Sequence, residues 1–396
     1  MIPRILGPYL VRDATYYSVV TITGPRQSGK TTLARSTFPS HAYVSLEPTD
    51  ERRFAREDPR GFLARYSGPV IIDEVQHVPD LLSYIQTAVD GQPSPGKFVL
   101  TGSQNLLLMS RVSQSLAGRS GILNLLPFSR AELEGTPQAE PESPASLFAG
   151  THTGLDLWEA IRTGFYPPIH DRGIPPEVWI PDYIRTYIER DVRSLTNIGD
   201  LDTFERFLSL CAGRAGQLLS YSGLAADCGV AVDTARRWVS LLKTSFIVFV
   251  LQPHHRNFNK RVIKSPKLYF HDTGLLCWLL GIRDAAQIVS HPLRGAIFEN
   301  YVLAEIAKAY LHHRRPAPLF FWRDRTGHEI DLLIEEAGSL FPVEIKSAQT
   351  PSPDMLEGLL WWSRIAGVSA DMATLVYAGR EAFTRNAVAV RPWFAI

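Results

Sequence analysis

The sequence has 396 residues, a length that predicts two or three domains, and a net charge of +1. Of its residues, 45% are hydrophobic and 20% are charged, which is the composition of an ordinary globular protein. No apolar run approaches the roughly 20 residues that span a bilayer, the N-terminus lacks the features of a signal peptide, and the three cysteines have neither disulfide nor zinc spacing. We therefore expect a soluble, cytoplasmic protein with no membrane partner.

The first predicted element is a β-branched strand at residues 17–23, followed by the pattern G-x-x-x-x-G-K-T and a helix at 33–38. In this context the pattern is typical of a P-loop, whose backbone N–H groups bind nucleotide phosphates. Lys30 is expected to reach the β- and γ-phosphates of ATP, and Thr31 to offer its hydroxyl to Mg²⁺. The predicted nucleotide-binding residues are Gly24, Pro25, Arg26, Gln27, Ser28, Gly29, Lys30, Thr31 and Thr32.

The next predicted strand, at residues 70–72, leads into Asp73 and Glu74. Its apolar character is typical of a strand buried on both faces of a parallel sheet, which places the two carboxylates at the edge where ligands bind. Asp73 is expected to hold Mg²⁺ through water. Glu74 is expected to orient and deprotonate the attacking water, a role that hydrolysis needs and a small-molecule P-loop kinase does not.

A third predicted strand, at residues 97–100, ends in the polar sequence TGSQ. Ser103 or Gln104 could lie there between Glu74 and the γ-phosphate. For either residue taken alone, a strand that simply ends in a polar turn is an equally good interpretation.

The middle of the chain is divided by composition and charge. Residues 135–150 are rich in Pro, Ala, Ser and Glu and predict a flexible connection, and residues 155–195 are expected to be helical. Residues 136–200 carry five Lys/Arg against ten Asp/Glu, a balance of −5, whereas residues 201–275 carry ten against five, a balance of +5. Only the second balance is that of a nucleic-acid-binding segment.

Residues 201–275 show the order of a winged helix: helices at 204–212, 222–228 and 233–243, then strands at 246–251 and 268–270 around a basic segment. We expect the third helix to face the major groove of DNA and the basic segment to contact phosphates. Winged helices also serve as lids or protein docks in P-loop ATPases, so DNA binding is one of two interpretations. The predicted DNA-contacting residues are Thr234, Arg236, Arg237, Ser240, Arg256, Lys260, Arg261 and Lys264.

The C-terminal part is predicted to contain a helix at 294–310, strands at 319–322, 329–334 and 340–345, a helix at 354–365 and a strand at 373–377. This order matches the core of the PD-(D/E)xK nucleases. Asp331 and Glu344 would be ligands of Mg²⁺ or Mn²⁺, Glu299 a further ligand, and Lys346 would add positive charge near the nucleophile. A charged hairpin face is the alternative, and a nuclease-like fold does not imply a working nuclease.

Several segments together resemble the predicted AAA-type ATPases of bacteria and archaea that carry a C-terminal domain of unknown function. These segments are GPRQSGKTT, DEVQHVPDLL, LTGSQNLLL, SLAGRSGILNLLPFS, TGFYP at 163–167, YIRTYIERDVRSL at 183–195, KSPKLYFHDTGL at 264–275, RGAIFEN at 294–300 and VEIKSA at 343–348. The resemblance implies that Arg119, in the AGR sequence, is a γ-phosphate sensor or finger; a surface arginine at a helix end is the alternative. If Arg119 acted on a neighbouring chain, a dimer or ring would follow.

We therefore predict an α/β protein with an AAA-type P-loop ATPase domain at 1–135, a linker and helical segment at 136–200, a winged-helix domain at 201–275 and a PD-(D/E)xK nuclease-like domain at 276–396. The leading hypothesis is an ATPase that uses Mg²⁺, binds nucleic acid and carries a metal-dependent nuclease site, at which Mn²⁺ could replace Mg²⁺. The alternative is a nucleotide-dependent switch that docks a protein partner and has no nuclease activity.

Overall fold

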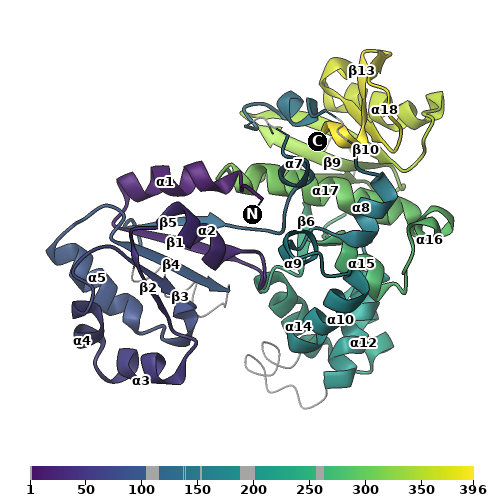
Figure 1. Cartoon of the computed structure of the whole chain (residues 1–396). Coiled ribbons are helices and arrows are strands. Elements are labelled where there is room, and N and C mark those ends of the chain that lie inside the picture. Colours follow the sequence, from purple (N-terminus) through teal and green to yellow (C-terminus); the bar gives the residue numbers. More distant parts are fainter. Residues whose placement is uncertain are drawn as a thin grey trace. The chain divides into compact units, whose positions relative to one another are not determined.

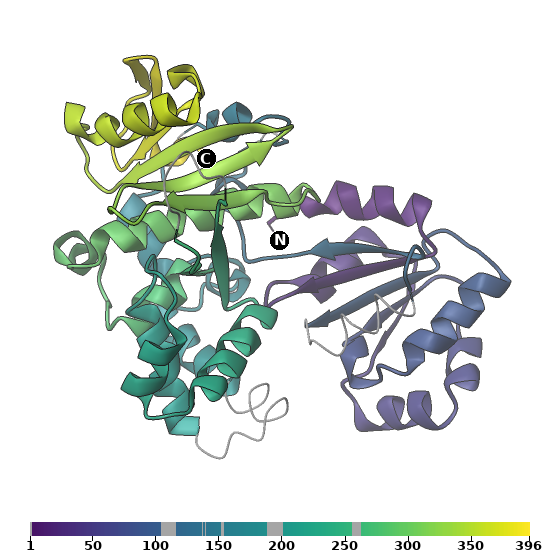
Figure 2. The ribbon, with the colours of Figure 1, turned by 180° about the vertical axis from the view of Figure 1, so that it is seen from behind.

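The computed structural model describes residues 2–103, 116–136, 138, 140–151, 154–187, 201–255 and 263–396. The chain forms two compact units, which Figures 1 and 2 show from opposite sides. The first unit contains Met1–Phe128 with two short segments, Thr244–Phe246 and Leu311–Arg315. All other residues belong to the second unit.

The first unit is built on a parallel sheet with the strand order β2-β3-β4-β1-β5. Its strands are β1 (Val19–Gly24), β2 (Ala42–Ser45), β3 (Val70–Asp73), β4 (Phe98–Ser103) and β5 (Ser120–Asn124). Its helices are α1 (Leu6–Tyr16), α2 (Lys30–Thr37), α3 (Thr49–Glu57), α4 (Pro59–Ala64), η1 (Val75–His77) and α5 (Leu81–Gly91). The predicted parallel sheet with a helix directly after the P-loop is therefore confirmed.

Both faces of this sheet are covered by apolar cores. Successive residues of a strand point to opposite faces, so neighbouring residues of one strand enter different cores. Ile71 packs in one apolar core with Leu10 of α1, whereas its neighbour Ile72 packs in the other with Phe62 of α4. A strand that is buried on both faces needs a continuous apolar sequence, which β3 has up to Asp73. Its first polar side chain therefore lies at the carboxyl edge of the sheet.

The second unit contains an eight-stranded mixed sheet with the order β12-β13-β11-β10-β9-β8-β6-β7. Its strands are β6 (Val248–Pro253), β7 (Lys267–Phe270), β8 (Leu319–Arg323), β9 (Glu329–Glu336), β10 (Ser339–Lys346), β11 (Thr374–Tyr377), β12 (Phe383–Arg385) and β13 (Val388–Pro392). Its helices are α7 (Arg130–Glu134), α8 (Leu157–Thr163), α9 (Pro167–Asp171), α10 (Pro176–Tyr187), α12 (Leu201–Ala212), α13 (Tyr221–Cys228), α14 (Val232–Thr244), α15 (Thr273–Leu279), α16 (Ala285–Ser290), α17 (Arg294–His312) and α18 (Glu357–Ala366). Short 3-10 turns complete it: η2 (Pro144–Phe148), η4 (Pro353–Leu356), η5 (Ala370–Met372) and η6 (Trp393–Ala395).

Helices α12, α13 and α14 and the antiparallel pair β6–β7 follow one another in the predicted order. Gly229 ends α13 in the left-handed conformation, with φ 72°, and so makes the turn toward α14. The segment before α13 adds to β7, because Gly216 N–H donates to Leu268 O at 2.8 Å and Leu219 N–H donates to Pro266 O at 2.7 Å.

The β6–β7 hairpin is not a separate wing, because β6 also pairs with β8. The pairing is parallel and joins Gln252 to Phe320 and Pro253 to Phe321. The expected boundary at 275/276 therefore does not separate two compact bodies, and residues 201–275 share one sheet with the C-terminal strands.

Residues 140–150 also differ from the expected flexible connection. Leu147 and Phe148 of η2 are buried, and Gly150 N–H donates to Ala395 O at 2.7 Å. A Cβ at Gly150 would lie 2.8 Å from Phe394 O, so glycine permits this close approach. The segment is packed against the C-terminal end of its unit.

Across the part of the chain that the structure describes, no helix combines the length and the apolar character that crossing a membrane requires.

Candidate functional site

The P-loop lies at the carboxyl end of β1. A Cβ on Gly24 would collide with the carbonyl oxygen of Leu125, so only glycine fits there. Gln27 and Gly29 both have left-handed backbones, with φ of 61° and 92°. Left-handed residues that alternate with right-handed ones turn successive N–H groups toward one point, which is how such loops hold phosphates.

Lys30 begins α2 and is buried, and its ammonium group closes the loop. Nζ donates to Gly24 O at 3.1 Å and to Pro25 O at 2.7 Å. Arg4 holds the loop from outside, because its guanidinium donates to Ser28 O at 2.8 Å. Ser28 Oγ is buried, and among the described residues it has no hydrogen-bond partner. The loop therefore contains a polar atom that a bound phosphate could satisfy.

Asp73 accepts hydrogen bonds from three hydroxyl groups. Thr31 Oγ1 donates to its two carboxylate oxygens at 2.9 and 3.1 Å, and Tyr43 donates to Oδ2 at 2.9 Å. The third donor is Thr101 of β4. Burial, and next the neighbouring Asp73, raise the pKa of Tyr43 to about 12. Neither Tyr43 nor Thr101 was predicted from the sequence.

Glu74 adopts a left-handed backbone with φ 57°, which is uncommon outside glycine. Gln76 holds its side chain: Nε2 donates to Glu74 Oε2 and, at 3.1 Å, to Ser103 Oγ. The predicted residues Glu74 and Ser103 therefore meet through Gln76, which the sequence did not single out. Gln104, the other candidate at the end of β4, lies outside the described residues.

Arg119 lies at the opposite edge of the sheet. It directly precedes β5, and the parallel register pairs the first residue of β5 with Val19, the first residue of β1. Strands rise roughly 3.3 Å per residue, so the length of β1 separates Arg119 from the P-loop. Its Nη2 donates to Asp90 Oδ2 of α5 at 3.0 Å. The structure does not bring Arg119 to the nucleotide site of its own chain, and a role at the γ-phosphate would require a second copy.

The first site fits ATP and Mg²⁺. Besides its backbone N–H groups, the loop offers the Lys30 ammonium and the Ser28 hydroxyl, which has no hydrogen-bond partner among the described residues. Thr31 and Asp73 place hydroxyl and carboxylate oxygens within hydrogen-bond distance of each other, and these are the donor types that Mg²⁺ prefers.

Two of the predicted DNA-contacting residues, Arg236 and Arg237, are exposed on α14. The Arg236 guanidinium lies 5.2 Å from the centre of the Tyr221 ring, and Arg237 Nη2 donates to Thr234 Oγ1 at 3.3 Å. Lys264 is also exposed. Arg256, Lys260 and Arg261 lie outside the described residues.

Three of the predicted C-terminal residues come together on neighbouring strands. Asp331 of β9 accepts the Ile345 N–H at 2.9 Å. The Lys346 ammonium bonds to Glu344 and lies 3.9 Å from Asp331 Oδ2. Glu344 Oε2 is buried and lacks a hydrogen-bond partner among the residues described. Burial, and next the charge of Asp331, raise the pKa of Glu344 to about 8.

Glu299 of α17 enters the same neighbourhood but is held by other residues. Lys267 Nζ lies 3.1 Å from Glu299 Oε1, Tyr269 donates to the same oxygen, and Lys267 also bonds to Glu329. Burial, and next the charge of Asp331, raise the pKa of Glu299 to about 7 although Lys267 opposes the rise. Lys267, Tyr269 and Glu329 were not predicted as site residues.

The expected metal set of Glu299, Asp331 and Glu344 is therefore not formed. Within the described ranges, no group of three or more His, Cys, Asp or Glu residues is placed to hold a metal ion. The physical reason is that the Lys267 ammonium, whose side chain is 4% exposed, already occupies a carboxylate oxygen of Glu299, whereas the Lys346 side chain at Glu344 is 37% exposed. The Asp331–Glu344 pair, with its unsatisfied oxygen, still fits a single divalent cation; the three-carboxylate set does not.

Three of the segments that carried the family resemblance, at 163–167, 264–275 and 294–300, contact one another in the second unit. The Asn300 side chain accepts Phe270 N–H at 2.7 Å and donates to Phe270 O at 2.8 Å. Asp272 caps α15 and accepts the Phe165 N–H at 2.7 Å. Phe165 and Asp272 are 107 positions apart, so this contact joins distant parts of the chain.

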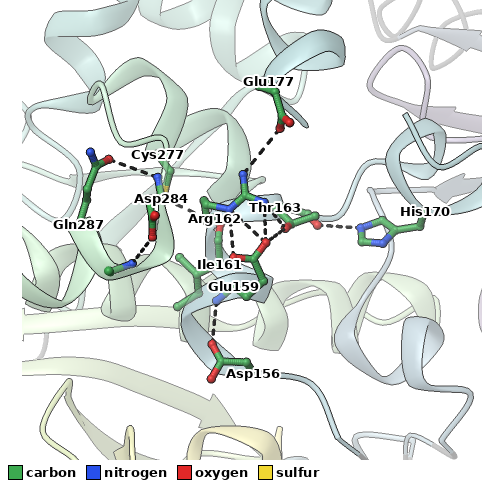
Figure 3. A network of polar contacts seen from close by, with 12 residues as sticks. Asp156, Glu159, Ile161, Arg162, Thr163, His170, Glu177, Cys277, Asp284 and Gln287 are labelled. Carbon is green, nitrogen blue, oxygen red and sulfur yellow. Dashed lines mark hydrogen bonds and ion pairs between the residues drawn. The ribbon is translucent and has the colours of Figure 1, made fainter. Parts of the chain in front are cut away.

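Polar contacts fix the beginning of the TGFYP segment (Figure 3). Arg162 pairs with Glu159 and lies 3.9 Å from Glu177. The His170 ring lies 2.8 Å from Gly164 O. This network stabilises the turn between α8 and α9.

Comparison with known families assigns three regions. Residues 16–134 match the family described as "AAA domain", residues 154–286 match "Domain of unknown function (DUF8612)", and residues 294–395 match "Domain of unknown function (DUF4143)". The first unit is thus an AAA-type P-loop ATPase domain, as predicted. The two other families carry no described activity.

Two curated mycobacterial proteins are similar over most of the chain. They are "Uncharacterized protein Mb2031c" of Mycobacterium bovis and "Uncharacterized protein Rv2008c" of Mycobacterium tuberculosis, each 36% identical over 338 residues, which is 84% of this chain and 71% of theirs. Among solved structures, the Walker-type ATPase PABY2304 of Pyrococcus abyssi is 15% identical over 69% of this chain and 94% of its own, with a TM-score of 0.39. A TM-score this low adds nothing to the family assignment.

Proposed function

Because the chain belongs to the same family as the mycobacterial proteins Mb2031c and Rv2008c and contains an AAA domain, we propose that it binds ATP with Mg²⁺ and hydrolyses it. One observation carries this proposal. Thr31 of the P-loop donates a hydrogen bond to Asp73, and the next residue, Glu74, is held by Gln76. Metal-binding oxygens and a carboxylate held by a neighbouring amide lie at one edge of the sheet.

Each residue has a role that its contacts support. The loop N–H groups and Lys30 bind phosphate oxygens, and Lys30 is already fixed by Gly24 O and Pro25 O. Thr31 and Asp73 would hold Mg²⁺, which neutralises phosphate charge when bound. Glu74, oriented by Gln76, accepts the proton of the attacking water.

Two substitutions test this proposal. Lys30→Ala should abolish ATP binding, and Glu74→Gln should preserve binding but reduce phosphate release by about 10²–10⁴-fold, the usual contribution of a general base. Binding is measured with a fluorescent ATP analogue and turnover by phosphate release. Glu57→Gln, the same change at an exposed position on α3, is the matched control. Phosphate release at the wild-type rate in Glu74→Gln would contradict the role given to Glu74.

We further propose that residues 201–275 bind DNA as a winged helix. The exposed Arg236 and Arg237 on α14 and the balance of +5 support this proposal. Phosphate contacts release counterions, so affinity should fall steeply with salt. Arg236→Ala with Arg237→Ala removes two contacts expected to base edges and should weaken binding by about 1–3 kcal/mol for each arginine, with Arg53→Ala on α3 as the control. If no salt-dependent DNA binding is seen, the protein-docking switch becomes the better proposal.

For the C-terminal strands we propose a metal-dependent phosphodiester cleavage site formed by Asp331, Glu344 and Lys346. The buried, unsatisfied Oε2 of Glu344 supports it, since a divalent cation would satisfy that oxygen together with Asp331. Labelled single-stranded, duplex, flapped and branched DNA and RNA should be cleaved in Mg²⁺ or Mn²⁺ by the wild type and by Lys97→Ala, and not by Lys346→Ala. If Lys346→Ala cleaves these substrates as fast as the wild type, the cleavage does not depend on Lys346, and the proposed site is contradicted.

A further inference from the structure

Lys267 is a buried cation that reaches into the C-terminal carboxylates from the hairpin. It is 3% exposed, its Nζ lies 3.1 Å from Glu299 Oε1, and it also bonds to Glu329. A buried carboxylate is costly unless a cation or several donors compensate it. Lys267 supplies that compensation to two carboxylates that are mostly buried, those of Glu299 and Glu329, whose side chains are 15% and 21% exposed.

The position of Lys267 is fixed by several elements. Lys267 pairs across the strands with Leu251 of β6 and forms a bridge to Leu218. Asn300, which directly follows Glu299 on α17, binds both backbone groups of Phe270 on β7. These bonds set the register of α17 against β7. The backbone pairings therefore fix the positions of Lys267 and Glu299, so that their side chains lie within contact distance.

Electrostatics keep this lysine charged. Burial alone would lower the pKa of Lys267, but the charges of Glu299, Glu329 and Asp331 raise it above its usual value. An ammonium group in contact with two carboxylates supplies positive charge where a bound metal ion would supply it. It also excludes that ion, because the two cations would repel each other over the same oxygens.

We propose that Lys267 is an internal counter-ion that takes the place of a divalent cation at Glu299 and Glu329, so that Glu299 is not a metal ligand and the cluster offers a metal only Asp331 and Glu344. The second half of this statement rests on the proposed cleavage site. The first half does not, because it concerns the lysine and its two carboxylates alone.

A charge-conserving double variant tests the proposal. Lys267→Met with Glu329→Gln removes one positive and one negative charge and frees Glu299 to join Asp331 and Glu344. All proteins carry Asp73→Asn, which removes the metal-binding carboxylate of the first unit. Mn²⁺ binding is measured by calorimetric titration and by the rise in the thermal midpoint. The double variant should bind Mn²⁺ about tenfold or more tightly than its parent, since a third carboxylate ligand is added.

The matched control removes another buried Lys–Glu pair of the same unit. Lys308 and Glu305 lie 2.7 Å apart on α17, each 1% exposed. Lys308→Met with Glu305→Gln should lower the thermal midpoint and leave Mn²⁺ affinity unchanged. An equal gain of Mn²⁺ affinity in this control would show that the gain comes from loosened packing, and it would overturn the proposal.

The remaining outcomes also decide. A double variant that binds Mn²⁺ no more tightly than the parent overturns the proposal. A parent without Mn²⁺ affinity beside a double variant that binds it supports the counter-ion role and contradicts the cleavage site. If the double variant is unfolded without metal, circular dichroism across a Mn²⁺ titration replaces calorimetry. Recovery of structure supports the proposal, and a failure to recover structure overturns it.

A single substitution gives a further test. If the parent protein binds Mn²⁺, Glu299→Gln must leave its Mn²⁺ affinity within about threefold, and a larger loss of affinity contradicts the proposal.

Discussion

His271 is a buried imidazole that must stay neutral in the folded protein. Its ring centre lies 4.8 Å from that of Phe249. Burial, and next the charge of Lys308, lower its pKa from 6.5 to about 3. A group whose folded pKa is lower than its unfolded pKa contributes stability above the unfolded value, and this contribution is lost as the pH falls.

We expect the wild type to lose stability below about pH 6.5, by up to about 1.4 kcal/mol per pH unit from this residue, because the unfolded chain takes up a proton that the folded chain does not. His271→Gln removes that slope. Urea unfolding of both proteins at about pH 8, 6.5 and 5.5 checks the prediction. The difference in unfolding free energy between them should shrink as the pH falls. A constant difference would show that His271 has the same pKa in the folded protein as in the unfolded chain.

At the residue scale, the sequence singled out residues that lie at the P-loop and at the end of β3, and not the residues that contact them. Lys30, Asp73 and Glu74 could be predicted because their chemistry follows from a local pattern of strand, loop and helix. Tyr43 and Lys267 could not, because each meets its carboxylate partner through a contact between distant segments. Tyr43 lies 30 positions from Asp73, and Lys267 lies 32 positions from Glu299.

At the level of elements, the contact of Asn300 with β7 connects the longest helix of the second unit to its sheet. Asn300 is fully buried and satisfies both the N–H and the C=O of Phe270. Asn300→Leu should leave these two groups buried without partners, at a cost of roughly 1–3 kcal/mol each. Chemical unfolding measures the loss. A loss below about 0.5 kcal/mol, the usual effect of a surface substitution, would mean that water or a shifted helix replaces the amide.

The elements differ in how far the sequence determines them. Helices α12, α13 and α14 were predicted within a few residues, because their turns and apolar spacing are local signals. Strands β12 and β13, of 3 and 5 residues, were missed because so short a run has no clear period. The pairing of β6 with β8 joins Gln252 to Phe320, and no local pattern contains it.

At the scale of the whole molecule, two compact units with separate cores should respond separately to ligands. The proposed function has Mg²⁺ and ATP bind the folded first unit, and such binding should stabilise it by about 2.7 kcal/mol at a concentration one hundred times Kd. Calorimetry of Glu74→Gln, which is expected to bind ATP without turnover, should show two transitions, of which nucleotide moves only one. A single transition that moves as a whole would show that the units unfold together.

The pairing of Lys267 with Glu299 has a consequence for the order of synthesis. The lysine precedes its helix partner by 32 positions, and a ribosome adds about 5–20 residues per second. The hairpin is therefore synthesised about 2–6 seconds before Glu299. Over that interval its ammonium group lacks this carboxylate, and the second edge of strand β6 is open. During that interval the hairpin cannot complete its native contacts, and its free edge is a site where chaperones would bind or chains would aggregate.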